Sequence, residues 1–360
     1  MKKTASLALA LVLCLGLAIP VSASGSGVVN GYTPFSVTNA NTAVVKEDGS
    51  LWAWGNNLYG QLGTGNTENL YAPAKVLDNV KVVSCGYDHT AVVKTDGSLW
   101  TWGKNYYGQL GTGDTVDSMA PVKIMDNVAN VSCGDKYTIA IKTDGSLWTW
   151  GYDNVYGFLG TGGIGNNTND TGNAYQTTPV KIMDNATAVT CDDSHVAVIK
   201  SDGSLWMWGF SWHGTLGPSV AANKATTTPI KVMDDVSAVG LGSYHTAVIK
   251  TDGSLWTWGN NYCGQLGIGN TQNSRTPIKV MENVTVVSCG TRFTAAIKED
   301  GSLWTWGENN YGQLGNNGGY DIRVGVMSSV SPCLTTPTKV MDNVSAVACG
   351  GYYTVAAKTD

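Results

Sequence analysis

The sequence predicts an all-β fold: a β-propeller of the seven-bladed type with four-stranded blades, of which the seventh is incomplete. The first observation is an Asp-Gly pair that recurs six times, with its Asp at positions 48, 96, 144, 202, 252 and 300. A repeat of this length indicates a propeller or a solenoid. The second observation is that each period holds four short strand-like runs and no helical periodicity, which is the makeup of a propeller blade.

The first 23 residues have the form of a bacterial secretory signal peptide. Lys2 and Lys3 precede an apolar run, and Val21-Ser22-Ala23 has the small-x-small form of a cleavage site. We therefore expect cleavage near Ala23 and a secreted or cell-surface protein. Cys14 leaves a lipoprotein as the alternative, although the bulky Leu before it favours ordinary cleavage. Residues 24–34 then form an N-terminal segment, and residues 35–360 form a propeller of six full repeats plus the start of a seventh.

The second unit shows how each blade is built. After the run "VVSCG" come the β-branched run His89–Lys94, the return strand Ser98–Gly103 and, beyond a glycine-rich loop, the strand Pro121–Met125. Asp-Gly between two such runs is typical of a type I′ hairpin turn, in which both central residues have positive φ. Asp126-Asn127 then turns the chain into the first strand of the next unit.

Each return strand carries two tryptophans. Trp100 and Trp102 lie two residues apart, so both point to the same face of the strand. We predict that each pair fills the gap between one blade and the next. The twelve structural tryptophans are Trp52, Trp54, Trp100, Trp102, Trp148, Trp150, Trp206, Trp208, Trp256, Trp258, Trp304 and Trp306.

Most cysteines fall at a single register of the repeat, although cysteines in an exported chain usually indicate disulfides. Leu241 fills this register in one copy, so it is a small apolar site and its thiols are predicted to be free and buried. The register comprises Cys85, Cys133, Cys191, Cys289 and Cys349. Cys263 and Cys333 lie outside it, and the sequence leaves open whether they are paired.

The connections predict two unlike faces. In a meander the loops after the first and third strands share one face, and the Asp-Gly and Asp-Asn turns share the other. Between the copies in this chain the turns hardly vary, whereas the loops vary in length and in aromatic content. Function commonly lies on such loops, and Tyr, Trp and Arg dominate protein-binding hot spots. The predicted binding residues are Tyr87, Asp88, Asp135, Lys136, Trp212, His213, Tyr244, Arg292 and Tyr352. The alternative is that these loops vary because nothing constrains them.

No pattern predicts catalysis, a cofactor or a metal site. His89 and His245 share a register with Phe293, and a position that accepts Phe does not serve as a general base. The sequence offers His213 no nucleophile or carboxylate partner. Asp192 and Asp193 are neighbours in sequence, and their position in a solvated loop is enough to explain them. We therefore expect a protein that is not an enzyme.

Charge excludes several partners. The chain has 22 Lys and Arg against 27 Asp and Glu, and loss of the two signal lysines makes the mature part more acidic still. Nucleic acids and anionic membranes both demand clustered positive charge. No stretch beyond the signal approaches the roughly 20 apolar residues that span a bilayer. We expect a monomer.

The repeat resembles that of the regulator-of-chromosome-condensation family. The strings Gly242–Thr246, Asp252–Gly259 and Gly264–Gly267 carry the resemblance in one copy, and six units show it. The resemblance implies a seven-bladed propeller whose face binds a protein. The seventh unit stops at Asp360, and the N-terminus supplies another first strand, so overlap of the two ends does not complete the blade.

Three functions are compatible with these observations, in order of preference. The first is a secreted, non-catalytic protein whose loop face captures another protein, as an inhibitor or adhesin does. The second is binding of a cell-wall or host glycan through loop aromatics. The third, guanine-nucleotide exchange, is implied by the resemblance but disfavoured by the signal peptide, because an exported chain does not meet a cytosolic GTPase. The identity of the partner does not follow from the sequence.

Overall fold

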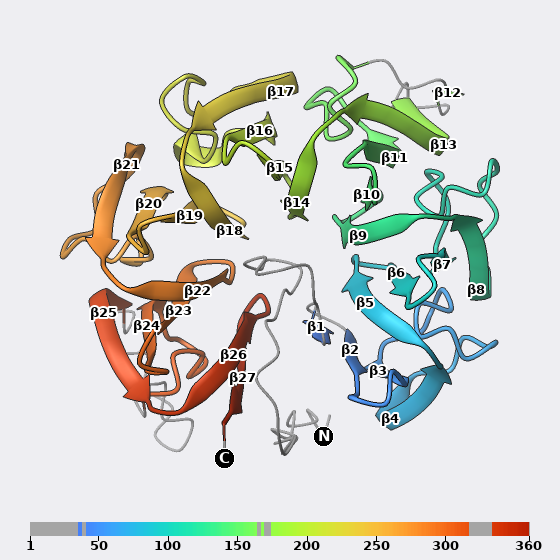
Figure 1. The fold of residues 1–360 in the computed structure, drawn as a ribbon, viewed down its shortest axis with the longest axis horizontal. Coiled ribbons are helices and arrows are strands. Elements are labelled where there is room, and N and C mark those ends of the chain that lie inside the picture. The colour runs from blue at the N-terminus through green and yellow to red at the C-terminus, as the bar shows by residue number, and fades with distance from the viewer. Residues whose placement is uncertain (1–34, 38–40, 164–166, 169–173, 317–332, 360) are drawn as a thin grey trace, which may run out of the picture.

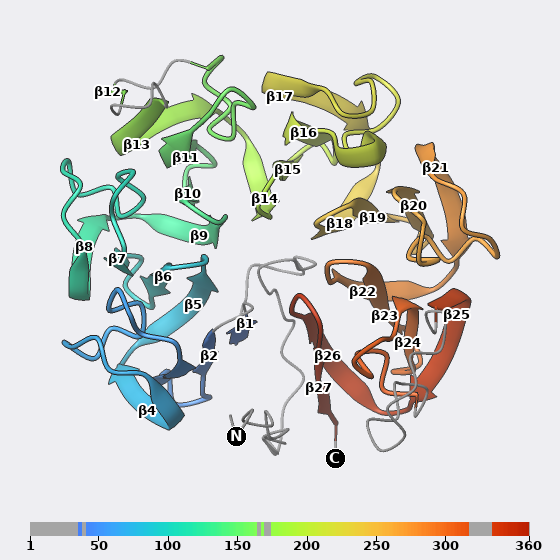
Figure 2. The same ribbon diagram turned by 180° about the vertical axis from the view of Figure 1, so that it is seen from behind.

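The computed structural model describes residues 35–37, 41–163, 167–168, 174–316 and 333–359. The predicted signal peptide (1–23) and the N-terminal segment (24–34) lie outside these residues. The described chain is built almost entirely of β-strands, with one short 3₁₀ helix, η1 (Trp212–Gly214). Figures 1 and 2 show the sheets as blades around a central axis, with the first strand of each blade nearest the axis and the fourth at the rim.

The blades follow one another in chain order, and every strand pair is antiparallel. The letters A to D denote the first to fourth strands of a blade. The first three blades are β1 (Phe35–Val37), β2 (Asn41–Val45), β3 (Leu51–Gly55) and β4 (Leu70–Leu77); β5 (Val80–Cys85), β6 (His89–Lys94), β7 (Leu99–Gly103) and β8 (Ser118–Met125); and β9 (Val128–Cys133), β10 (Tyr137–Lys142), β11 (Leu147–Asp153) and β13 (Ala174–Met183), to which β12 (Asn167–Thr168) adds a short outer strand.

The remaining blades repeat the meander until the seventh, which has two strands among the described residues. They are β14 (Ala186–Cys191), β15 (His195–Lys200), β16 (Leu205–Phe210) and β17 (Ala225–Met233); β18 (Val236–Gly242), β19 (His245–Lys250), β20 (Leu255–Gly259) and β21 (Ser274–Met281); β22 (Val284–Cys289), β23 (Phe293–Lys298), β24 (Leu303–Glu308) and β25 (Cys333–Met341); and β26 (Val344–Cys349) with β27 (Thr354–Lys358). The predicted propeller is therefore confirmed, with an incomplete seventh blade.

The Asp-Gly hairpins correct one prediction, because they are not two-residue type I′ turns. In the second blade the Lys94 amide donates to the Ser98 carbonyl at 2.9 Å, which encloses a three-residue loop. Gly97 has φ of 81°, and Asp96 is not among the described residues with positive φ. The Asp96 carboxylate instead accepts the Ser98 amide at 2.9 Å. Because the Asp side chain closes the turn onto the backbone two residues later, only the glycine has to adopt a left-handed conformation.

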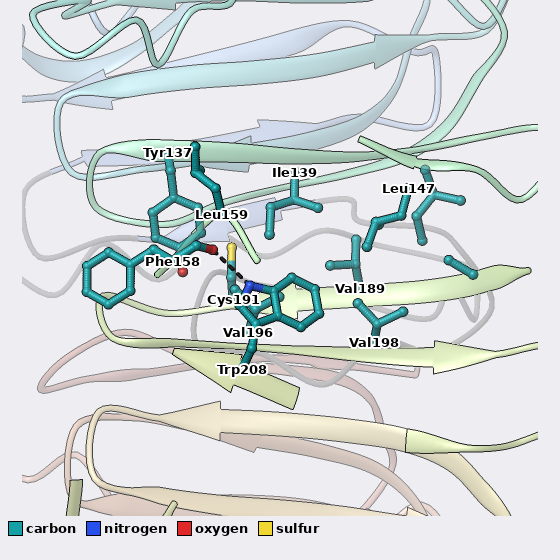
Figure 3. Packing of buried hydrophobic residues seen from close by; sticks show 12 residues of the cluster. Tyr137, Ile139, Leu147, Phe158, Leu159, Val189, Cys191, Val196, Val198 and Trp208 are labelled. Atoms are coloured by element: carbon teal, nitrogen blue, oxygen red, sulfur yellow. Dashed lines mark hydrogen bonds between the residues drawn. The ribbon is translucent and has the colours of Figure 1, made fainter. Parts of the chain in front are cut away.

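The core consists of successive layers between neighbouring blades, and the second tryptophan of each pair is central to it. Trp102 is 0% exposed, and its indole N–H donates to the Gln61 carbonyl of the first blade at 2.9 Å. The same bond links Trp208 to the Phe158 carbonyl, as Figure 3 shows. A buried indole N–H usually has such an acceptor, because leaving it unpaired costs free energy.

The first tryptophan of each pair occupies a different place within the same layer. Trp100 is half-buried at the margin of the layer, and its N–H donates to the Ser98 hydroxyl of its own hairpin at 2.9 Å. The ammonium of Lys94 lies 4.8 Å from its ring centroid. The outer tryptophan therefore braces the turn, while the inner one joins two blades.

The cysteine register lies beside the axis, and its thiols are free and buried as predicted. The Cys133 amide donates to the Ser84 hydroxyl of the preceding blade at 2.9 Å, and the Cys85 amide donates likewise to Ser36 at 3.0 Å. Burial raises the pKa of Cys85 to about 11. The register thus holds adjacent A strands together and presents no reactive thiolate.

The seventh blade packs against both of its neighbours. Ala346 and Ala348 lie against Val44 of the first blade, and the Thr354 hydroxyl donates to the Gln313 carbonyl of the sixth at 2.6 Å. In the second blade, the Thr90 hydroxyl of strand B and the indole N–H of Trp102 in strand C both donate to one carbonyl of the preceding blade, that of Gln61. Trp54, which faces the seventh blade, is only half-buried. Among the described residues, the layer between the seventh and first blades is therefore thinner than the other inter-blade layers.

Candidate functional site

One face of the propeller is formed by the A–B and C–D loops, which are hydrogen-bonded to each other in the second to sixth blades. The Asp88 carbonyl accepts the Lys104 amide at 2.9 Å in the second blade, and the Tyr244 carbonyl accepts the Asn260 amide at 2.8 Å in the fifth. We call this side the loop face. It carries every predicted binding residue, because each of them lies in an A–B or a C–D loop.

The C–D loops are internally braced. Asn105 is buried, its side-chain oxygen accepts the Leu110 amide at 2.9 Å, and its amide group donates to the Asp114 carbonyl at 3.1 Å. Asn57 and Asn261 make the corresponding bonds in the first and fifth blades. Loops held in this way present their exposed side chains from a fixed backbone.

The A–B loops are braced by the Gly-x-x-His-Thr motif. The His89 ring lies over Gly86, where an added Cβ would overlap it, and its Nε2 lies 2.9 Å from the Thr138 hydroxyl of the next blade. Burial lowers the pKa of His89 to about 3. The ring is therefore neutral at physiological pH and joins blades instead of exchanging protons.

Aromatic side chains form a continuous arc over the loop face from the second blade to the fifth. Neighbouring rings contact one another across blade boundaries, with centroids 4.5 Å apart for Tyr107 and Tyr152 and 4.5 Å apart for Tyr156 and Phe210. The aromatic arc comprises Tyr106, Tyr107, Tyr152, Tyr156, Phe210, Trp212, His213, Tyr244 and Tyr262. The buried ring of Phe158 links Tyr152 to Tyr156. Three of its rings are well exposed: Tyr106 at 58%, Trp212 at 40% and Tyr262 at 66%.

Two cations lie on the arc. The Lys136 ammonium is 5.7 Å from the Tyr107 centroid and 5.8 Å from that of Tyr152, and it lies 3.4 Å from the Asp135 carboxylate. The Arg292 guanidinium lies 5.4 Å from the Tyr244 centroid. A cation over an aromatic face is attracted by the ring quadrupole. Both charges are thereby positioned among the rings without being buried.

The predicted residues fall into three groups. Asp135, Lys136, Trp212, His213, Tyr244 and Arg292 lie on or against the arc. Asp88 forms an ion pair with Lys104 at 3.0 Å, and Tyr87 is exposed beside it at the axial opening. Tyr352 lies apart from these, against Tyr311 of the sixth blade, with centroids 5.4 Å apart.

The sequence-based prediction missed six residues of the arc, because it singled out loops by their differences. Four of them lie in C–D loops whose sequence recurs between units, so they did not stand out from the structural repeat: Tyr106, Tyr107, Tyr156 and Tyr262. Tyr152 and Phe210 directly follow the usual glycine of strand C, within β11 and at the end of β16. An aromatic residue directly after this glycine, where the other units have Asn56, Lys104, Asn260 and Glu308, was the available sequence signal.

The axial opening holds a cavity of about 80 Å³. The Asp192 carboxylate accepts the amides of Ser194 and His195, each at 2.8 Å, and lies 3.0 Å from Nδ1 of His195. Protein atoms around the carboxyl of Asp193 raise its pKa to about 7, and the carboxylates of Asp192 and Asp135 add to the shift. The opening is therefore acidic.

Within the described part of the chain, no group of three or more His, Cys, Asp or Glu side chains is arranged to hold a metal ion. No helix among the same residues is long and apolar enough to cross a membrane. The loop face therefore combines hydrogen-bonded loops, exposed aromatic rings, two cations held against these rings and a small acidic opening.

Comparison with known families identifies the architecture. The model of the RCC1-like domain matches residues 121–360, and models of the regulator of chromosome condensation (RCC1) repeat match residues 48–93, 96–141 and 80–109. The chain belongs to the RCC1-like domain family. The family resemblance predicted from the repeat is thereby confirmed.

Solved RCC1-like propellers share the fold at low sequence identity. The chain is similar to Prp20p from Saccharomyces cerevisiae (19% identity, TM-score 0.76, 91% of this chain and 82% of that one) and to human WBSCR16 (22%, 0.75, 96% and 88%). It is likewise similar to yeast RCC1 in its complex with Kap60 (18%, 0.74, 91% and 80%). At these identities the likeness establishes the fold, and the RCC1-like fold supports a protein-binding or regulatory role in general.

Proposed function

We propose that this RCC1-like protein is a secreted or cell-surface binding protein, without catalytic activity, whose loop face captures another protein in the manner of an inhibitor or an adhesin. The observation that carries the proposal is the aromatic arc. It places Trp212, Tyr106 and Tyr262 in exposed positions and sets Lys136 and Arg292 against neighbouring rings. Aromatic residues and arginine are the side chains that dominate binding energy at protein interfaces.

The rigidity of the loops adds to the argument. Immobilising a flexible side chain or loop at an interface costs about 0.5–1.5 kcal/mol for each side chain ordered. Here the bonds of Asn105 and Asn261 hold the loops before any partner arrives. A partner that docks on the arc therefore meets a surface whose ordering cost has largely been met during folding.

A glycan is the less favoured ligand, because the amides beside the exposed rings are already used. Asn260 accepts from the Gln265 side chain at 2.8 Å and from the Tyr262 amide at 3.1 Å. Asn56 accepts from Gln61 at 3.0 Å in the first blade. Sugar recognition needs planar amides and carboxylates free to bond hydroxyl groups next to a stacking ring.

The relatives suggest partner classes without deciding among them. Prp20p is described with binding properties towards Gsp1p and histones, and yeast RCC1 is seen bound to Kap60. Protein capture agrees with both. Guanine-nucleotide exchange is disfavoured by the predicted signal peptide, and a nucleic-acid partner is disfavoured by the excess of acidic residues. We propose that the protein acts as a monomer.

Affinity capture from culture and host-surface fractions tests the proposal. The baits are the parent chain, a variant with Tyr106→Ala, Trp212→Ala and Tyr262→Ala, and a control with Tyr71→Ala. Tyr71 is 95% exposed on β4 of the first blade, outside the aromatic arc. A protein retained by the parent and the control but lost by the folded triple variant supports the proposal. Equal retention by all three baits contradicts it, and recovery of polysaccharide alone favours the glycan.

A further inference from the structure

Cys263 and Cys333 come from different blades and meet at the loop face. Cys263 lies in the C–D loop of the fifth blade, and Cys333 is the first residue of β25 in the sixth. The loop packs closely on that strand: an added Cβ at Gly264 would lie 2.7 Å from the Cα of Thr335, and the Gly269 amide donates to the Thr335 carbonyl at 2.8 Å. The two backbones are therefore held in fixed register directly after the two cysteines.

The two thiols interact with each other, and the interaction shifts their pKa values in opposite directions. The interaction with Cys333 lowers the pKa of Cys263, and the guanidinium of Arg292 acts in the same direction. The same interaction, together with burial, raises the pKa of Cys333. Both side chains are only partly buried, unlike the five thiols beside the axis. Cys263 is thus the more nucleophilic member of an accessible pair.

Both positions depart from the repeat. The register of Cys263 holds an aromatic residue in the other units, namely Tyr59, Tyr107, Tyr156, His213 and Tyr311. The register of Cys333 holds Asn69, Asp117 and Asn273 in three units, where each side chain accepts an amide of its own C–D loop at 2.7 Å. A thiol does not replace that acceptor. Three units lack this acceptor, with Tyr175, Ala225 and Cys333 at the register, and only the sixth unit places a cysteine there, against the one C–D loop that has a cysteine at the facing position.

We propose that Cys263 and Cys333 form a disulfide that joins the fifth and sixth blades in the exported protein. The Cys263 thiolate attacks a low-molecular-weight organic disulfide, forms a mixed disulfide and releases one thiolate. The Cys333 thiolate then attacks the Cys263 sulfur, forms the protein disulfide and releases the second thiolate. The two protein thiols lose two electrons and two protons, and the organic disulfide is reduced to two thiols. Extracellular compartments supply such oxidants.

The proposed bond would anchor strand D of the sixth blade at its first residue. The bond would close the stretch of chain from Cys263 to Cys333, which includes the fourth strand of the fifth blade and the first three strands of the sixth blade. Crosslinks that close long loops restrict the unfolded chain more than those that close short ones. The inference concerns the scaffold and holds whichever partner binds the loop face.

Peptide mapping of the full chain tests the inference. The purified protein is equilibrated with oxidised and reduced glutathione, quenched by alkylation and digested, beside the variants Cys263→Ser and Cys333→Ser. We expect a linked peptide pair containing Cys263 and Cys333 in the parent, lost on reduction, with the five axial thiols alkylated only after denaturation. Each single variant should instead carry glutathione on its remaining cysteine. Alkylation of both cysteines as free thiols in oxidised glutathione, or glutathione on both in the folded parent, would overturn the inference.

Discussion

Replacing the inner tryptophan of a pair should cost far more stability than replacing the outer one. Trp102 is 0% exposed and donates to the Gln61 carbonyl at 2.9 Å, whereas Trp100 is half-buried and donates to a hydroxyl of its own hairpin. Both changes to Phe remove one indole N–H and the same volume. The difference between the two variants therefore reports the place of the ring and not its chemistry.

The magnitude for Trp102→Phe has two parts. A lost intramolecular hydrogen bond costs about 1 kcal/mol, and Gln61 keeps the Thr90 hydroxyl as a donor at 2.8 Å, so its carbonyl is not left without a partner. The smaller ring leaves a cavity in a fully buried layer, which costs roughly another 1–2 kcal/mol when large core aromatics lose volume. We expect about 2–3 kcal/mol for Trp102→Phe and about 0.5–1 kcal/mol for Trp100→Phe, where solvent and Lys94 fill the space.

Guanidinium unfolding followed by circular dichroism measures both variants at one pH and one salt concentration. The midpoint of Trp102→Phe should fall clearly below that of Trp100→Phe, with unchanged slopes. Trp54→Phe is an internal control, because Trp54 has the inner register but is only half-buried against the incomplete seventh blade. Its cost should resemble that of Trp100→Phe. Equal midpoints for the Trp100 and Trp102 variants would refute the assignment of the inner ring to the inter-blade joint.

Four further outcomes are expected. The folded pKa of His89 and His245, about 3, lies below the unfolded value near 6.5, so the unfolded chain binds more protons between these values and stability should fall as the pH drops from about 6.5 towards 3, by roughly 1 kcal/mol per pH unit for each histidine. Changing both to Tyr, the residue at this register in the third unit, should flatten the pH dependence of the denaturation midpoint, and an unchanged slope would contradict the cause. Gly97→Ala should cost about 1 kcal/mol, because φ is 81° while the nearest atom to an added Cβ is 3.7 Å away; a thermal melt unchanged from the parent would contradict this. Cys191, whose pKa burial raises to about 12, should resist iodoacetamide at pH 8 until the protein unfolds, as mass spectrometry would show. Once a partner is known, Trp212→Ala should weaken its binding about 10- to 100-fold by calorimetry, and an unaltered affinity would remove Trp212 from the interface.

The repeat by itself determined the architecture. Four period-two runs within each Asp-Gly period predict one meander, and a register that accepts Cys, Leu or Val predicts burial beside the axis. These inferences succeed because hairpins and alternation depend on residues close together in the sequence. The prediction of turn type failed for a local reason. Asp-Gly alone does not distinguish a two-residue loop from a three-residue one, and the bond from Ser98 to Asp96 decides between them.

Only the tertiary structure decided what lies between the blades. Trp100 and Trp102 share a face of one strand. Only Trp102 donates to the loop of the preceding blade, whereas Trp100 donates to its own hairpin. Rings of the aromatic arc and the thiols of Cys263 and Cys333 likewise belong to separate units, about fifty or more residues apart, that the closing of the ring brings together. A repeated sequence predicts each blade well because its contacts are local. The binding surface arises from neighbouring blades, whose side chains differ and whose contacts no single repeat contains.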